Sequence, residues 1–222
     1  MDTGALMATY LDESLAKLEW FEGSIPWMYL DTRGHVTVGV GLMVPDAVAA
    51  EKLPFMIGHR AATSTEIVTE FARVEAMPMG RPALFYRVDN GLVLEKAEID
   101  SLLRTVLEGF EGELREKISG YEKYPDSVKM ALLDMAYNLG PIGFLHGYPT
   151  LIHAVEAGNW AKAAANCFRH GPGALRNQWT QKMFLENVLG ALKAEGDGAL
   201  KRFGYGVLGM SAAAAEWLRK KQ

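Results

Sequence analysis

The amino-acid sequence predicts an α+β fold that is mostly helical, with a small lobe that carries a β-hairpin and a larger lobe made of helices. Three observations support this prediction. Apolar and polar residues alternate between Pro26 and Leu42, which is the period of a strand. Apolar residues recur at helical spacing from Lys96 to Ile118. Shorter helical patterns follow, with glycine or proline between them.

The composition is that of a globular protein and excludes several classes of partner. The chain has 222 residues, of which 49% are hydrophobic and 23% charged, and its net charge is −4. This is enough for one sizeable core or two small lobes. The sequence has no long basic stretch of the kind that binds nucleic acid, and no apolar run approaches the ~20 residues of a membrane span. We therefore expect no nucleic-acid partner, no membrane span, and a monomer.

The N-terminal sequence and the cysteine content bear on where the protein is made. The N-terminus is acidic and amphipathic, and it lacks the basic and apolar segments of a classical signal peptide. Cys167 is the only cysteine, so no intramolecular disulfide can form. We expect a protein that is made in the cytoplasm and whose fold needs no oxidising compartment.

The first predicted element is a helix over residues 5–21. Its apolar stripe consists of Leu11, Leu15, Leu18 and Phe21. Gly23 supplies a C-terminal stop, so Glu22 is predicted to be the last helical residue.

A hairpin from Pro26 to Leu42 is expected to reverse at the turn Asp31-Thr32-Arg33-Gly34. Tyr29 shares a face with Asp31 because side chains alternate along a strand. On the return strand, one face holds Val36, Val38, Val40 and Leu42, and the other holds His35, Thr37, Gly39 and Gly41. If the strands pair about the turn, Thr37 points the same way as Asp31. The glycines on this face let a ligand approach the backbone closely.

Residues 43–94 are less regular. Thr63 and Glu66 have the spacing of a capping box, which predicts a helix that ends near Val74. Asp89-Asn90-Gly91 between two apolar stretches predicts a second small hairpin.

The remainder of the chain is predicted to be helical. After the long helix from Lys96 to Ile118, further helices are expected at about 126–138, 149–157, 159–169, 175–195 and 211–221. No low-complexity linker interrupts the chain, so we predict one domain over residues 1–222. Its hairpin lobe spans residues 1–94 and its helical lobe residues 95–222.

Two acidic residues near the hairpin are candidates for catalysis. Glycoside hydrolysis needs one carboxyl group that protonates the leaving oxygen and a second that acts as base or nucleophile. Glu22 lies at the negative end of a helix dipole and near aromatic residues, and both favour its protonated form. Asp31, in a polar turn, should stay ionised, and Thr37 can hold a water beside it. A glutamate at a helix end and an aspartate in a turn are also common without catalytic roles, so spacing alone leaves both interpretations open.

The pattern of Glu22, Asp31 and Thr37 with Gly39 and Gly41 resembles the signature of the phage-type lysozymes, glycoside hydrolase family 24. Weaker similarities continue in Asp89–Glu95, Ala131–Gly140, Tyr148–Leu151, Gly158–Ala164 and Arg176-Asn177. The resemblance covers most of residues 10–190 and implies a lysozyme-like fold. The chain departs from the family at Leu42, where many members have histidine, and in an insertion over residues 43–88.

The resemblance implies a muramidase that cleaves the β-1,4 bond between N-acetylmuramic acid and N-acetylglucosamine in the glycan strands of peptidoglycan. Glu22 would be the general acid, and Asp31, helped by Thr37, would position or activate water. Tyr29, Gly39, Asn138 and Arg176 would contact the substrate. For Asn138 and Arg176, a helix cap and an exposed charge are equally good explanations.

Several alternatives stay open at this point. The competing function is a catalytically silent lysozyme-like module that binds peptidoglycan or has a structural role. An active muramidase could be an endolysin released by lysis or an antibacterial toxin delivered by a secretion system, and in both cases it would act in the periplasm or cell wall. A toxin would be accompanied by a cognate immunity protein. Thr37 beside Asp31 favours inversion over retention.

The remaining residues with chemical potential suggest no further site. No histidine pair has the spacing of a helical zinc motif, so we expect no metal and no cofactor. His35 either contacts substrate or is a solvent-exposed turn residue. Cys167 is predicted to belong to the core.

Overall fold

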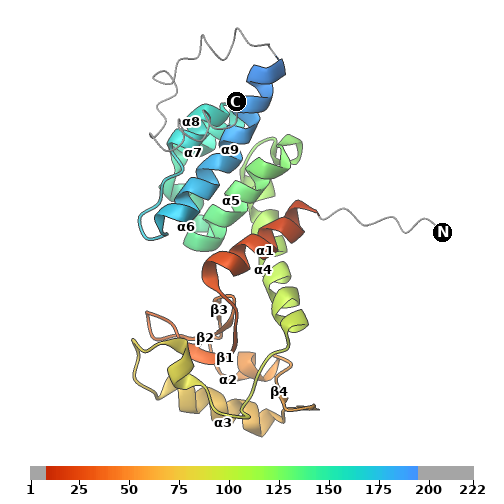
Figure 1. Ribbon diagram of the computed structural model, residues 1–222, viewed down its shortest axis with the longest axis vertical. Coiled ribbons are helices and arrows are strands. Elements are labelled where there is room, and N and C mark those ends of the chain that lie inside the picture. Colours follow the sequence, from red (N-terminus) through yellow and green to blue (C-terminus); the bar gives the residue numbers. More distant parts are fainter. Residues whose placement is uncertain (1–8, 195–222) are drawn as a thin grey trace, which may run out of the picture. The chain divides into compact units, whose positions relative to one another are not determined.

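The computed structural model describes residues 9–194. It is α+β and mostly helical, as the sequence predicts. It divides into two compact units, which we call the hairpin unit (Leu15–Val106) and the helical unit (the residues before and after it). The boundaries fall inside helices α1 (Tyr10–Glu22) and α4 (Lys96–Lys117), both labelled in Figure 1. The helix predicted at 211–221 lies outside the described residues.

Helix α1 begins at Tyr10 because Thr9 caps it. The Thr9 N–H and hydroxyl both donate to Asp12 Oδ2 at 2.8 Å, and the Asp12 N–H donates to Thr9 Oγ1 at 3.3 Å. This reciprocal arrangement satisfies donors that a helix N-terminus leaves unpaired. Residues 5–8 of the predicted helix lie outside the described residues. The helix ends at Glu22, as predicted, and Gly23 follows with φ +77°.

The hairpin unit contains a three-stranded antiparallel sheet with the order β1-β2-β3 (Figure 1). Its strands are β1 (Ile25–Leu30), β2 (Val36–Gly39) and β3 (Leu42–Met43). Tyr29 lies opposite Thr37. At the turn, the Asp31 N–H donates to the His35 carbonyl at 3.0 Å. The predicted turn is therefore present, and Tyr29, Asp31 and Thr37 share one face of the sheet.

The return strand ends at Gly39 instead of continuing to Leu42, so the prediction of one long strand was wrong. Gly39 and Gly41 have φ values of +66° and +81°, which side chains disfavour. The chain reverses between them, and Leu42 pairs back with Val38. A Cβ on Gly39 would lie 3.2 Å from Ile99 Cγ2, so the glycine also permits close packing of α4.

The second hairpin predicted around Asp89–Gly91 is wrong. A turn forms there, with Asn90 at φ +55°. The segment before it is the 3-10 helix η1 (Ala83–Tyr86), not a strand. Val93, after the turn, exchanges backbone hydrogen bonds of 2.8 and 2.9 Å with Met56. The local pattern indicates a turn but not which distant segment pairs with it.

The rest of the hairpin unit surrounds helix α3 (Ser64–Glu75). The capping box predicted from Thr63 and Glu66 is present, and Arg60 pairs with the same Glu66 carboxylate at 2.6 Å. The sequence analysis missed three short elements: α2 (Ala47–Glu51), β4 (Met56–Ile57) and β5 (Arg60–Ala61).

The helical unit is built around α5, whose residues 128–136 are all buried. Helix α9 packs against α5 and α8 (Figure 1). The elements are η2 (Tyr121–Lys123), α5 (Asp126–Leu139), α6 (Pro141–Gly147), α7 (Pro149–Glu156), α8 (Trp160–Ala165) and α9 (Ala174–Ala194). Helix α6 was not predicted. Helix α8 is shorter than predicted, because the chain leaves the helix at Asn166 and buries Cys167 and Arg169.

Replacing Gly39 with alanine should destabilise the protein by about 2 kcal/mol, because it adds a contact with Ile99 to the strain of a positive φ. The matched control is Gly80→Ala, where φ is +74° but no atom lies within 4 Å of the new Cβ. We expect the control to cost about 1 kcal/mol, the backbone strain alone. Urea unfolding measures both, and equal losses would show that the Ile99 contact imposes no constraint.

Candidate functional site

Tyr29 in β1 connects three other residues of the predicted site. It lies opposite Thr37 on β2. The pKa of its phenol is raised above the ordinary value, first by burial and then by the negative charges of Asp31 and Glu22. Asp31 follows β1 directly, and Tyr29 and Thr37 pair across the hairpin. Glu22 ends the helix that leads into β1.

The Asp31 carboxylate is fixed by the turn that it begins. Its Oδ1 accepts hydrogen bonds from the N–H groups of Arg33 and His35, both at 2.8 Å. Its Oδ2 lies 3.4 Å from His35 Nδ1. Partial burial raises the pKa of Asp31, but the backbone donors of His35 and Arg33 outweigh it and hold the pKa below the ordinary value. Asp31 is therefore an oriented carboxylate that stays ionised at neutral pH.

Glu22, the last residue of α1, is exposed. The prediction that neighbouring aromatic residues would dry it was wrong. Trp20 exposes 62% of its surface. It forms a cation–π contact with Lys17, whose Nζ lies 4.0 Å from the ring centroid. Trp27 turns toward η1, where its Nε1 donates to the Ala83 carbonyl at 2.9 Å. Any desolvation of Glu22 must therefore come from a bound ligand.

Thr37 and Gly39, both in β2, differ in what they can offer a ligand. Thr37 is buried, and its hydroxyl donates to the His35 carbonyl at 3.1 Å. The lone pairs of Oγ1 remain able to accept hydrogen bonds. At Gly39, Ile99 of α4 fills the space that the sequence analysis assigned to a ligand. Contact of a ligand with Gly39 would therefore involve its backbone.

Asn138 belongs to the helical unit and lies in the last turn of α5. It is half-buried. Its amide forms no hydrogen bond with the residues that the structure describes, so it does not act as a cap there. Both a donor and an acceptor remain available to a ligand.

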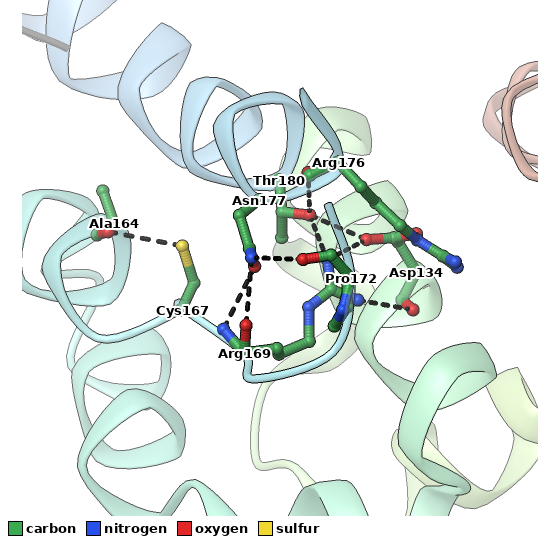
Figure 2. Close-up of polar contacts among 8 residues, drawn as sticks. All are labelled: Asp134, Ala164, Cys167, Arg169, Pro172, Arg176, Asn177 and Thr180. Atoms are coloured by element: carbon green, nitrogen blue, oxygen red, sulfur yellow. Dashed lines mark hydrogen bonds and ion pairs between the residues drawn. The ribbon is translucent and has the colours of Figure 1, made fainter. Parts of the chain in front are cut away.

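Arg176 is buried on α9, so the alternative of an exposed charge was wrong. Figure 2 shows its guanidinium beside Asp134 of α5, and its Nε donates to Asp134 Oδ1 at 2.7 Å. Asp134 Oδ2 also accepts from Arg169 Nη2 at 2.6 Å and from the Thr180 hydroxyl at 2.7 Å. One buried carboxylate thus holds two guanidinium groups in place.

A second set of contacts fixes the loop that carries Arg169. Asn177 Oδ1 accepts from the Arg169 N–H, and Asn177 Nδ2 donates to the Arg169 carbonyl, both at 3.0 Å (Figure 2). The sequence analysis missed both Asp134 and Arg169. The signal for Asp134 was a single acidic residue inside the apolar run MALLDMA. Nothing local marks Arg169, because its partners come from distant parts of the chain.

Cys167 lies in the core, as predicted. Burial raises the pKa of its thiol to about 12, and Sγ donates to the Ala164 carbonyl at 3.3 Å. Within residues 9–194, no group of three or more His, Cys, Asp or Glu residues is arranged to hold a metal ion. None of the described helices is long and apolar enough to cross a membrane.

Comparison with protein families gives a match over most of the chain. The family model described as phage lysozyme matches residues 19–174, which is more than half of the chain. The matched region includes Glu22, Asp31, Thr37 and Asn138 and ends two residues before Arg176. No curated protein matches the chain.

Asp134→Asn should destabilise the protein by about 3–5 kcal/mol, because it leaves two buried guanidinium groups without their counter-charge. The control is Glu186→Gln, which removes an exposed ion pair with Lys182 in the same unit and should cost less than about 1 kcal/mol. Thermal and urea unfolding measure both. A loss at Asp134 no larger than the control would mean that the buried network contributes little to stability.

Asp31→Asn should destabilise the protein at neutral pH more than at acid pH. The folded-state pKa of Asp31 is held below 3.8, so its ionised form stabilises the fold above that pH. This contribution disappears as the pH falls through the folded-state pKa. Urea unfolding of both proteins between pH 7 and pH 3 measures the difference, which should shrink toward acid pH; growth of the difference would contradict the assignment.

Proposed function

The chain belongs to the phage lysozyme family of peptidoglycan hydrolases, and we propose that it is an active muramidase. Its substrate is the β-1,4 bond between N-acetylmuramic acid and N-acetylglucosamine. The observation that carries the proposal is the Asp31 carboxylate, which two backbone donors fix in the hairpin turn, with Glu22 at the end of the helix that leads into the same hairpin. Two carboxyl groups with different environments are what acid–base cleavage of a glycoside requires.

Glu22 is the general acid in this proposal. It is exposed at the end of α1. A saccharide bound over it would exclude water and favour the protonated form. The protonated Glu22 then gives its proton to the leaving oxygen of the glycosidic bond.

Asp31 and Thr37 act together on the attacking water. The Thr37 proton is already committed to the His35 carbonyl, so Oγ1 accepts from the water instead of donating to it. Asp31 Oδ2, the oxygen that the two backbone donors do not occupy, accepts the other hydrogen. A water held by both has its lone pair free for the anomeric carbon, which favours direct attack and inversion.

Four further residues are proposed to contact the saccharide. Tyr29 presents a half-buried ring beside the carboxylates, and Gly39 can contribute its backbone. In the helical unit, Asn138 offers its amide group. Arg176 is buried against Asp134, so its guanidinium would have to become accessible before it could contact the saccharide.

The cell wall is the proposed place of action. An endolysin would reach it when the host cell is lysed, and an antibacterial toxin would reach it through a secretion system. A toxin would have a cognate immunity protein that blocks the activity. Examination of the neighbouring genes for a small inhibitor of this kind separates the two roles.

Glu22→Gln should lower the rate of peptidoglycan cleavage by about 10²–10⁴-fold, because it removes a general acid and keeps the side-chain shape. The control is Glu19→Gln, one turn earlier in α1, which removes only an ion pair with Lys96 and should leave the rate nearly unchanged. Release of reducing ends from purified sacculi measures the rate, and mass spectrometry identifies muramic acid at the new ends.

Full activity of Glu22→Gln would refute the role given to Glu22. If the wild-type protein binds sacculi but releases no reducing ends, the chain is a silent binding module. Proton NMR of freshly released products reports their anomeric configuration, and retention would contradict direct attack by water.

A further inference from the structure

We propose that residues 79–88 of the hairpin unit form a surface that binds the peptide stems of peptidoglycan through their carboxylates. This proposal rests on the proposed function, because it adds a second contact with the same substrate. The surface lies within residues 43–88, for which the sequence analysis predicts an insertion. Its apolar side chains, anchoring, arginines and position relative to Asp31 carry the argument.

The segment exposes an unusual amount of apolar surface. Met79, Leu84, Phe85 and Val88 expose 56%, 66%, 47% and 44% of their surface, respectively. Single exposed apolar residues are ordinary, but a contiguous group of them marks a binding site.

The segment is also firmly anchored, so its exposure does not result from poor packing. Tyr86 is fully buried, and its hydroxyl donates to the Pro78 carbonyl at 2.9 Å. Arg73 Nη2 donates to the Tyr86 carbonyl at 2.5 Å, and Trp27 Nε1 donates to the Ala83 carbonyl at 2.9 Å. A preformed surface of this kind loses little conformational entropy when a ligand binds.

Two arginines accompany the apolar side chains. The guanidinium carbon of Arg81 lies 5.6 Å from the centroid of the Phe85 ring, and that of Arg87 lies 5.2 Å from the centroid of the Trp27 ring. Within the part of the chain that the structure describes, neither arginine forms an ion pair. Each guanidinium lies against an aromatic ring and keeps its N–H donors available. Two parallel N–H groups of a guanidinium can bind both oxygens of a carboxylate.

Their availability is notable because acidic residues are plentiful. The net charge of the chain is −4, and two other arginines of the same unit have carboxylate partners. Arg60 pairs with Glu66 at 2.6 Å, and Arg73 pairs with Glu70 at 2.7 Å. Among residues 9–194, Arg81 and Arg87 are thus cationic groups without a carboxylate partner.

The surface adjoins the hairpin that carries Asp31. Met79 Sδ lies 3.6 Å from the position that a Cβ on Gly34 would occupy, and Gly34 closes the turn that Asp31 begins. Arg87 stacks on Trp27, two residues before Tyr29 on β1. Every N-acetylmuramic acid carries its peptide stem next to the bond that the proposed reaction cleaves. A strand bound at Asp31 therefore holds a stem within reach of this surface.

The chemistry of a stem matches the surface better than that of a bare glycan. Stem peptides combine free carboxylates with methyl and aliphatic side chains, which correspond to the two arginines and to the apolar group. A glycan whose stems have been removed keeps only the lactyl carboxylate beside each N-acetylmuramic acid ring, and it lacks the further carboxylates and the aliphatic side chains of the stem. We therefore assign the surface to the stems.

The test compares Arg81→Ser/Arg87→Ser with wild type on two soluble substrates: glycan strands with their stems and strands whose stems an amidase has removed. The KM for strands with stems should rise about tenfold, as expected for the loss of charge-assisted hydrogen bonds, while kcat stays unchanged. The KM for stem-free strands should rise much less, because these strands keep the lactyl carboxylate but lack the rest of the stem. About 0.5 M salt should reduce the difference between the proteins.

The matched control is Lys52→Ser/Lys123→Ser, which removes the same charge from two exposed positions outside residues 79–88 and should leave both KM values unchanged. Leu84→Ser removes an apolar contact, so it should raise the KM for strands with stems. This rise should be the same at low and high salt. Equal KM values for Arg81→Ser/Arg87→Ser and wild type on both substrates would overturn the proposal and leave a protein partner as the occupant. An equal rise on both substrates would also overturn it.

Failure of the proposed function gives a different result, because the wild-type protein would then cleave neither substrate. Co-sedimentation of the full chain with sacculi still tests the surface in that case. Binding to the sacculi that requires the stems and is lost in Arg81→Ser/Arg87→Ser supports the assignment. Binding that is the same without the stems, or the same in the variant, overturns it.

Discussion

The contact between the Asp31 carboxylate and the backbone of its own turn is the interaction on which the candidate site depends. Two N–H groups bind one carboxylate oxygen, and this closes the turn and aligns the strands on both sides of it. The alignment places Tyr29 opposite Thr37. The same two bonds stabilise the anion. One interaction therefore sets the hairpin register, the direction of the carboxylate and its charge.

In the helical unit, a cluster of buried charges fixes the positions of side chains. Asp134 lies inside an otherwise apolar stretch of α5, and its charge is balanced by arginines from the loop before α9 and from α9 itself (Figure 2). Such a cluster is costly to desolvate and costly to break. It therefore permits few alternative arrangements of the loop and the two helices, and a side chain such as Arg176 obtains a defined position from it.

Local patterns were sufficient for the longer helices and for the hairpin turn. The capping box at Thr63, the glycine stop after Glu22 and the long apolar face of α4 all involve residues close together in the sequence. The errors arose where distant residues decide the outcome. Val93 pairs with Met56, and Gly39 makes room for Ile99. For the candidate site, motif spacing predicts the two carboxylates, but the exposure of Glu22 and the burial of Arg176 depend on packing that no local pattern encodes.

The state of Cys167 has a practical consequence for a protein whose proposed target lies outside the cytoplasm. Its thiol is buried and strongly disfavoured from ionising, so it reacts poorly with oxidants and disulfides. With no second cysteine in the sequence, passage from a reducing to an oxidising compartment changes no covalent bond in the fold. A cysteine introduced at the surface would accordingly be the one reactive thiol, available for a single fluorophore or spin label.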